Sequence, residues 1–171
     1  MISDKVFEQS ISGVIGRRLP SMTTILAEAD VETSPAFRVL IVDDNLPWRR
    51  VVVSVLRKKP ELHFTGEAAD GLDAVQQAQE LQPDLIVLDI GLPTLNGLEA
   101  ARLIHERSPR SKILFLSGNR SLAIVKEALR TGASYVVKSD ASNDLLPAVT
   151  AVLHGMQFVS RSLARTIPAQ L

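Results

Sequence analysis

The chain has 171 residues, of which 46% are hydrophobic and 22% are charged, and its formal net charge is zero. This length suits one domain plus an extension, and the balanced charge argues against the basic bulk of a nucleic-acid-binding protein. Cysteine is absent, which excludes disulfides and thiolate chemistry and fits a reducing cytoplasm as the expected location. No apolar stretch reaches the roughly 18 residues of a membrane helix, and no signal-peptide pattern is present.

Residues 1–36 are predicted to form an N-terminal extension that is partly disordered or contains one short helix. Three basic and five acidic side chains make this extension negatively charged. Proline at positions 20 and 35 interrupts any regular structure there. A short interaction helix and a loosely ordered tail are both compatible with the pattern. The apolar stripe of such a helix would consist of Val6, Phe7, Ile11, Val14 and Ile15.

A regular alternation of predicted strands and helices begins at Arg38. Residues 39–42 form an apolar run that is typical of a strand buried on both faces, and the run ends in Asp43 and Asp44. Asn45 can cap the helix that follows, with Pro47 in its first turn. The apolar face of that helix is expected to carry Trp48, Val51, Val52, Val55 and Leu56.

The middle of the chain predicts an edge strand and then a central one. Residues 63–68 form a weaker strand, followed by a helix that Asp70 caps and Pro83 ends. Residues 85–88 form a second fully buried strand, which runs directly into Asp89. A loop and a third helix come next, and their characteristic residues are Gly91, Pro93, Asn96 and Gly97 for the loop and Leu98, Ala101 and Ile104 for the helix.

The last part of the chain predicts two further strands. Residues 112–116 form a strand that ends at Ser117, and a helix after it ends at Gly132. Residues 134–137 form a short fifth strand that ends at Lys138. A fifth helix, capped by Ser142 or Asn143, ends at Gly155, and a tail with a short extended piece near Phe158 follows.

Five strands that alternate with five helices indicate an α/β fold with a doubly wound, five-stranded parallel sheet and right-handed crossovers. The expected strand order is 2-1-3-4-5, in which the first and third strands are neighbours. The carboxyl ends of parallel strands meet at one edge of the sheet. Asp43, Asp44 and Asp89 should therefore share one crevice with Ser117 and Lys138.

Three carboxylates in one crevice repel each other unless a cation neutralises them. Mg²⁺ prefers oxygen ligands and is usually held by one or two carboxylates together with water and phosphate. We expect Asp44 and Asp89 as direct ligands and Asp43 as a ligand that acts directly or through water. The backbone carbonyl of Gly91 could complete the protein's share.

The same crevice favours phosphoryl transfer. Lys138 can pair with Asp89 at rest and with a phosphoryl oxygen afterwards, and the Ser117 hydroxyl can donate to the same oxygens. Asp89 would attack the phosphoryl group and become an acyl phosphate. Each feature alone also fits a plain role, with the acidic pair as a helix cap, Ser117 in a turn and Lys138 as a solvated charge. Their joint placement at the ends of the appropriate strands favours the reactive site.

Residues 38–154 resemble the receiver domain of two-component response regulators. The resemblance rests on the acidic pair Asp43-Asp44, on the spacing of Asp89, Pro93 and Gly97, and on Ser117 and Lys138. The run at 138–142 is similar to the subfamily typified by nitrate and nitrite response regulators. This resemblance implies a flavodoxin-like receiver over residues 37–156 and a C-terminal tail over residues 157–171.

The resemblance also implies roles for individual residues. Asp89 would accept a phosphoryl group from a phosphohistidine of a sensor histidine kinase. Ser117 would be the switch hydroxyl, and Tyr135 the switch aromatic that turns inward when Ser117 moves. The Mg²⁺ ligands would be Asp43, Asp44, Asp89 and the Gly91 carbonyl.

The implied output surface is the face formed by the fourth helix, the fifth strand and the fifth helix. That face would serve an unknown downstream effector or a homodimer. The chain would not be an enzyme in the usual sense, because it would catalyse only its own phosphorylation and dephosphorylation. A non-phosphorylated receiver-like adaptor is the alternative, and no membrane association is expected.

Two features depart from the family pattern. Receivers often have proline after the lysine, whereas Ser139 follows Lys138 here, which leaves the geometry of that peptide bond open. Seventeen residues follow His154, too few for the helix-turn-helix domain usual in the subfamily, so no DNA-binding domain is expected in this chain. A stand-alone receiver and the receiver part of a longer transcriptional regulator both fit.

Two other classes fit the residues less well. A phosphatase with an aspartate nucleophile would need a second Asp two residues after the first, and Gly91 occupies that position. A flavodoxin-like electron carrier would need a phosphate-binding loop after the first strand, where Asp43 and Asp44 would repel a phosphate.

Overall fold

The computed structural model describes residues 36–166, so the prediction of a short helix within residues 1–36 falls outside the described part. Five strands form one sheet in the order β2-β1-β3-β4-β5, and every neighbouring pair is parallel. The predicted strand order and the edge position of β2 are confirmed. The strands are β1 Phe37–Val42, β2 Leu62–Ala68, β3 Leu85–Leu88, β4 Lys112–Ser117 and β5 Ser134–Val137.

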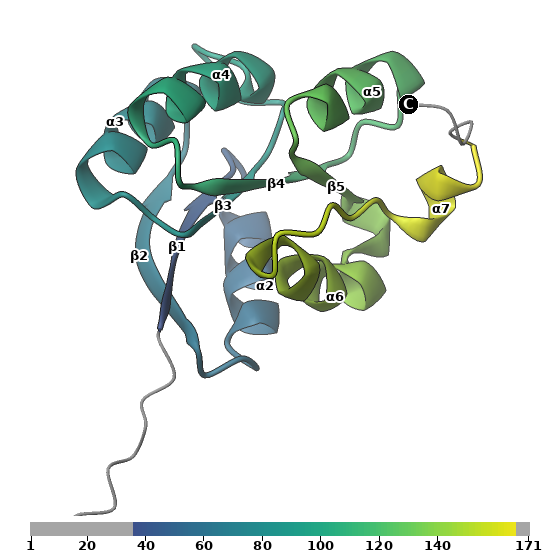
Figure 1. Cartoon of the computed structure of the whole chain (residues 1–171), viewed down its shortest axis with the longest axis horizontal. Coiled ribbons are helices and arrows are strands. Elements are labelled where there is room, and N and C mark those ends of the chain that lie inside the picture. The colour runs from purple at the N-terminus through teal and green to yellow at the C-terminus, as the bar shows by residue number, and fades with distance from the viewer. Residues whose placement is uncertain (1–35, 167–171) are drawn as a thin grey trace, which may run out of the picture. The chain divides into compact units, whose positions relative to one another are not determined.

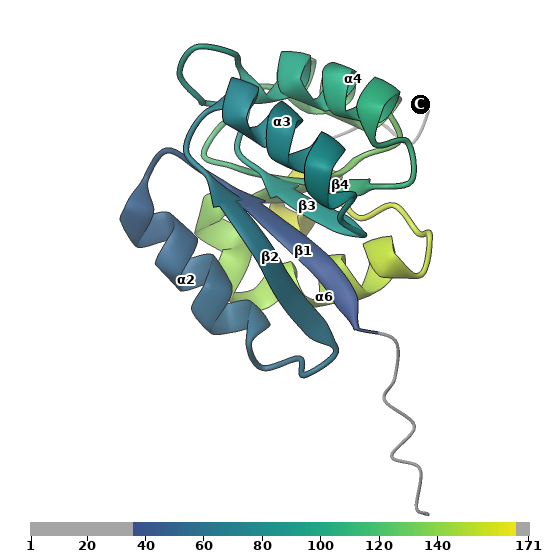
Figure 2. The ribbon, with the colours of Figure 1, turned by 90° about the vertical axis from the view of Figure 1, so that its left-hand side faces the viewer.

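Helices cover both faces of the sheet (Figures 1 and 2). On one face lie α2 and α6, and on the other lie α3, α4 and α5. A short 3₁₀ turn, η1, joins β5 to α6. The bounds are α2 Leu46–Leu56, α3 Gly71–Leu81, α4 Gly97–Arg107, α5 Leu122–Arg130, η1 Lys138–Asp140, α6 Ala141–Leu153 and α7 Arg161–Ala164.

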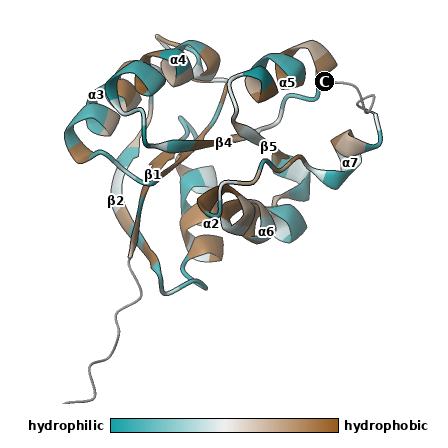
Figure 3. Cartoon of the chain, in the orientation of Figure 1, coloured by the Kyte–Doolittle hydropathy of each residue, from teal (hydrophilic) through white to brown (hydrophobic). Residues whose placement is uncertain are grey.

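The sheet lies between two apolar layers, one on each of its faces. All four residues of β3 and all four of β5 are buried, as expected for strands covered on both faces. Alternate residues of each strand point to opposite layers, so Leu40 packs toward α3 and α4 whereas Val39 and Ile41 pack toward α2 and α6. Figure 3 shows the apolar strands between helices of mixed polarity. Among the described residues, no helix has the length and apolar character needed to cross a membrane.

Side-chain caps fix where three helices begin. Asn45 accepts a hydrogen bond from the Trp48 amide, and Asp70 accepts from two amides at the start of α3, as predicted. Asn96 caps α4 in the same way. The predicted cap of α6 is wrong, because the chain passes from η1 straight into the helix and the cap position is Asp140. Ser142 and Asn143 lie inside the first turn of α6.

Residues 157–166, which we call the C-terminal strap, run along the free edge of β5. The extended piece expected near Phe158 is confirmed by the parallel bridge between Val159 and Tyr135. The strap then forms α7, a helix that the sequence analysis did not predict. Leu163 of this helix is only 3% exposed and belongs to the same apolar cluster as Tyr135. Four residues with one buried leucine are too few to show a helical period.

Candidate functional site

The carboxyl ends of β1 and β3 bring two acidic residues side by side. Val42 pairs with Leu88, so the next residues, Asp43 and Asp89, leave the sheet together. The Asp89 amide donates to the Val42 carbonyl at 2.9 Å. Carboxylate oxygens of Asp43, Asp44 and Asp89 lie within 4.8 Å of one another. Asp43 and Asp89 are buried and Asp44 is exposed, so the cluster opens to solvent on one side.

Lys138 brings a positive charge into this acidic cluster from the end of β5. Its Nζ donates to Asp89 Oδ2 at 2.8 Å and lies 2.7 Å from Asp43 Oδ2. The same Nζ lies 5.4 Å from the ring centroid of Trp48 in α2, within the range of a cation–π contact. The expected pairing of Lys138 with Asp89 is present, and the equally close contact with Asp43 was not anticipated.

The cluster carries more negative charge than one ammonium neutralises. Burial raises the pKa of Asp43 above its usual value, although the contacts with Lys138 and the Asn45 amide oppose that rise. Burial alone would lower the pKa of Lys138, but its contacts with Asp43 and Asp89 outweigh burial and raise that pKa. The ammonium therefore stays charged, and the buried carboxylates favour a further cation.

Backbone amides hold two of the carboxylates in position. Asp89 Oδ1 accepts from the Ile90 amide at 2.7 Å and from the Gly91 amide at 3.3 Å. Asp43 Oδ1 accepts from the Asn45 amide at 2.9 Å. Asp43 Oδ2 is buried and forms an ion pair with Lys138 Nζ at 2.7 Å. The three carboxylates of the cluster outnumber this one ammonium, and such an oxygen-rich cluster suits a hard divalent ion such as Mg²⁺.

Two glycines follow Asp89 and differ in how tightly they are packed. A Cβ on Gly97 would lie 2.0 Å from the Asp89 carbonyl oxygen, so the start of α4 rests directly on the Asp89 backbone. A Cβ on Gly91 would meet only Asp89 Oδ2, at an ordinary 3.9 Å. The role of the Gly91 carbonyl as a metal ligand remains a prediction.

Ser117 and Tyr135 meet at the loop between β4 and α5. Ser117 is 3% exposed, and its Oγ accepts from the Asn119 amide at 3.4 Å. The Tyr135 hydroxyl donates to the Asn119 carbonyl at 2.8 Å, and its ring packs beside Phe115. Burial raises the pKa of Tyr135 to about 12, against the opposing effect of Ser117.

Tyr135 lies in the inward orientation, with an exposure of 0%. Its inward turn in response to a movement of Ser117 stays a prediction. The backbone of Tyr135 is hydrogen-bonded on the outer edge of β5 by the strap. The sequence did not decide the geometry of the peptide bond between Lys138 and Ser139. In the structure this bond is trans.

Three residues near the site were missed or assigned only a packing role. Trp48 was expected only on the apolar face of α2, and Asn119 was given no functional role. Arg120 was not noticed, although its guanidinium donates to Ser139 at 3.2 Å and to Ser162 at 3.0 Å. Those hydroxyls are 19 and 42 residues further along the chain, so no local pattern could have shown the contact.

Comparison with known proteins agrees with this geometry. A family model described as the response regulator receiver domain matches residues 39–150. A protein-glutamate methylesterase/protein-glutamine glutaminase of Thermotoga maritima is 41% identical over 115 residues, which are 66% of this chain and 33% of that protein. The nitrate/nitrite response regulator NarL of Escherichia coli is 32% identical over 134 residues, 78% of this chain and 62% of that protein.

A solved structure shows the same fold. The crystal structure of a LuxR-family two-component response regulator from Aurantimonas sp. SI85-9A1 superposes with a TM-score of 0.72 and 31% identity, covering 76% of this chain and 94% of that chain. The chain thus spans nearly all of that structure but only one third to about three fifths of the two relatives above.

Proposed function

Because this chain belongs to the response regulator receiver domain family, we propose that Asp89 is the residue that accepts a phosphoryl group from the phosphohistidine of a sensor histidine kinase. Receiver domains accept phosphate in this way, and the proposal assigns the acceptor within this chain. The observation that carries it is the buried Asp89 carboxylate, held by Lys138 and next to two more carboxylates. A chain without cysteine fits the cytoplasm as the place of this reaction.

In the proposed step, a carboxylate oxygen of Asp89 attacks phosphorus while the phosphorus–nitrogen bond of the phosphohistidine breaks. The electron pair of that bond remains on the ring nitrogen, the ring takes up one proton from solvent, and histidine leaves as neutral imidazole. The product on this chain is an acyl phosphate. Lys138 lies within reach of the new phosphoryl oxygens and stabilises their charge, since it contacts Asp89 Oδ2 at 2.8 Å.

We also propose that Mg²⁺ is held by Asp43, Asp44, Asp89 and the Gly91 carbonyl. When bound, Mg²⁺ would neutralise the charge on the transferring phosphoryl oxygens. The three neighbouring carboxylates, two of them buried, support this assignment. Asp89 is held in position by the amides of Ile90 and Gly91.

The proposed output depends on the loop that follows Ser117. We propose that the Ser117 hydroxyl donates to the phosphoryl group and draws the loop at 118–121 with it. This movement biases the face of α5, β5 and α6 toward a partner, either a downstream effector or a second copy of the chain. Tyr135 contributes because its hydroxyl donates a hydrogen bond to the Asn119 carbonyl in this loop.

Acetyl phosphate labelling followed by intact mass spectrometry tests the proposal. The unaltered chain should gain one phosphoryl group with Mg²⁺ and little without it, and Asp89→Asn should gain none. Asp84→Asn is the matched control, because Asp84 lies directly before the first residue of β3 whereas Asp89 directly follows the last one. Undiminished labelling of Asp89→Asn would reject the assigned acceptor, and an unaltered chain that takes no phosphoryl group would indicate an adaptor.

A further inference from the structure

We propose that the C-terminal strap is a positioning element for Tyr135 and for the loop after Ser117, and that docking of the strap favours the phosphorylated conformation. This inference rests on the proposed function, which defines the phosphorylated conformation. The contacts themselves involve residues outside the acidic cluster.

The strap holds Tyr135 by its backbone from the free edge of β5. The Tyr135 amide donates to the Phe158 carbonyl at 2.8 Å, and the Ser160 amide donates to the Tyr135 carbonyl at 2.9 Å. The fully buried Ser160 also accepts from the Val137 amide at 3.0 Å through its side chain. These bonds continue the parallel sheet by one more short segment and satisfy backbone groups that an edge strand would leave free.

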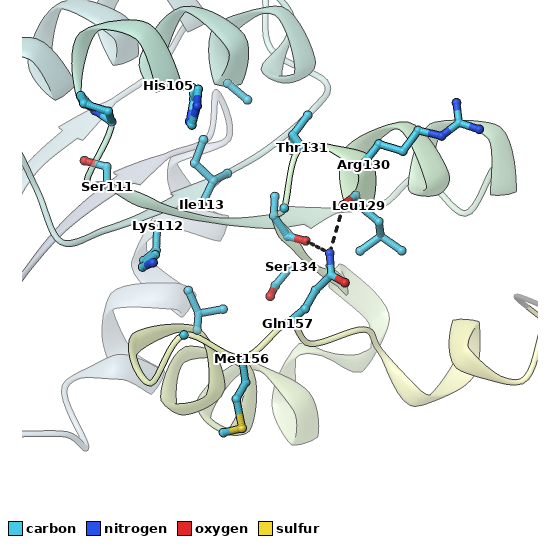
Figure 4. Close-up of a pocket in the computed structure, with 16 residues that line it drawn as sticks. His105, Ser111, Lys112, Ile113, Leu129, Arg130, Thr131, Ser134, Met156 and Gln157 are labelled. Carbon is cyan, nitrogen blue, oxygen red and sulfur yellow. Dashed lines mark hydrogen bonds between the residues drawn. The ribbon is translucent and has the colours of Figure 1, made fainter. Parts of the chain in front are cut away.

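Both ends of the strap are anchored. At its start, Gln157 Nε2 donates to the carbonyls of Leu129 at 3.1 Å and Ala133 at 2.8 Å, as Figure 4 shows. At the other end, the Arg161 amide donates to the buried carboxylate of Asp144 at 3.1 Å. Leu163 then fills a place in the apolar cluster that contains Tyr135.

A polar bridge joins the strap to the switch loop. Arg120, three residues after Ser117, donates to Ser162 of the strap and to Ser139 of η1. Ser162 in turn donates to the carboxylate of Asp140. The loop is therefore held on one side by the Tyr135 hydroxyl at Asn119 and on the other by the strap at Arg120.

These contacts fix the sign of the coupling. The proposed switch requires an inward Tyr135 beside a loop drawn toward Asp89, and Leu163 of the strap belongs to the apolar cluster that contains the inward Tyr135. An element that binds one of two conformations shifts the population toward it, and the coupling between two such events is reciprocal. Strap docking and Asp89 phosphorylation should therefore reinforce each other.

The test uses the full chain and its single tyrosine. Nitration by tetranitromethane, followed by intact mass, measures how often the Tyr135 ring becomes accessible, and no cysteine competes for the reagent. Arg120→Ala removes the polar bridge and should raise the nitration rate roughly fivefold, the effect of losing a modest net hydrogen-bond contribution. Leu163→Ala should raise it further, and Leu163→Met should restore slow nitration.

Arg165→Ala is the matched control, since it removes an exposed arginine of the strap. Its nitration rate should equal that of the unaltered chain. In a second arm, Arg120→Ala and Leu163→Ala should be labelled several-fold more slowly by acetyl phosphate with Mg²⁺, while Arg165→Ala is labelled normally. Circular dichroism confirms that the variants are folded, and Arg120→Ala serves as the test if Leu163→Ala does not fold.

Two results would overturn the inference. Equal nitration of Arg120→Ala and Arg165→Ala would show that the strap does not position Tyr135. Faster labelling of Arg120→Ala would show that the strap opposes phosphorylation. If the unaltered chain takes no phosphoryl group while nitration still differs between the variants, the proposed function fails and the positioning role of the strap stands.

Discussion

At the residue scale, the central feature is one ammonium group shared by two buried carboxylates. Lys138 contacts Asp43 and Asp89 at nearly equal distances, so it occupies the oxygens that a metal ion would also use. Removing one partner of a buried ionic group is costly because the remaining charges are left uncompensated. The ammonium and the proposed Mg²⁺ would thus both stabilise the cluster, and each would weaken the binding of the other.

Substitution of Lys138 by methionine should reveal this competition. We expect Lys138→Met to lower the free energy of unfolding in Mg²⁺-free buffer by about 3 kcal/mol, to bind Mg²⁺ more tightly and to be labelled more slowly by acetyl phosphate. Urea unfolding with and without Mg²⁺ measures the first two effects, with the fluorescence of the single tryptophan, Trp48, as the signal. Lys112→Met, at the exposed start of β4, is the control. Unchanged stability of Lys138→Met without Mg²⁺ would contradict this account.

Tyr135 makes a separate prediction about pH. Its pKa in the folded chain is raised to about 12, so the folded state holds the phenol proton more tightly than the unfolded state does. This contribution to stability is complete below about pH 10, where both states are protonated, and is lost as the pH rises toward 12. Tyrosinate absorbance of the native chain should therefore titrate well above that of the urea-unfolded chain. Coincident titration curves would show that Tyr135 is not buried.

At the scale of elements, the sequence predicts the strands correctly where a local pattern matches the burial of the residues in the folded chain. The apolar runs of β1 and β3 end abruptly in acidic residues, and parallel topology alone then brings Asp43 and Asp89 together. The helix α7 of the strap and its contact with the loop after Ser117 were not predictable in this way. Their determinants are contacts between residues far apart in sequence, such as Arg120 with Ser162.

The junction of β3 and α4 offers a prediction at this scale. Gly97→Ala would place a Cβ 2.0 Å from the Asp89 carbonyl oxygen, so the helix start or Asp89 must shift. We expect a loss of about 1–3 kcal/mol in the free energy of unfolding, as for other overpacked sites, and slower labelling by acetyl phosphate. Gly118→Ala is the control because its Cβ would meet no atom within 4 Å. Equal urea midpoints for the two variants would argue against the tight junction. The labelling rate of Gly97→Ala is compared with that of the unaltered chain, because Gly118 lies in the loop that the proposed switch moves.

At the scale of the whole molecule, the site joins elements from the length of the receiver fold. Asp43 follows β1, Asp89 follows β3 and Lys138 follows β5, so a ligand bound by all three requires the folded sheet. A ligand that binds only the native state stabilises it in proportion to the logarithm of its concentration. Mg²⁺ together with beryllium fluoride, a mimic of the phosphoryl group, should therefore stabilise the whole domain.

Thermal unfolding measures that stabilisation. Ligand at about a hundred times its dissociation constant adds about 2.7 kcal/mol, which should raise the Tm by roughly 8 °C for a domain of this size. Asp89→Asn should show a much smaller rise, because it lacks the carboxylate proposed to bind beryllium fluoride. Equal rises for both chains would place the ligand elsewhere.

The central claim is that Asp89 itself carries the phosphoryl group. Borohydride reduces an aspartyl phosphate to homoserine, so treatment of the labelled chain followed by peptide sequencing in the mass spectrometer identifies the acceptor without any mutation. The account predicts homoserine at position 89 only after incubation with both acetyl phosphate and Mg²⁺. Homoserine at position 43 or 44, with aspartate retained at 89, would contradict it.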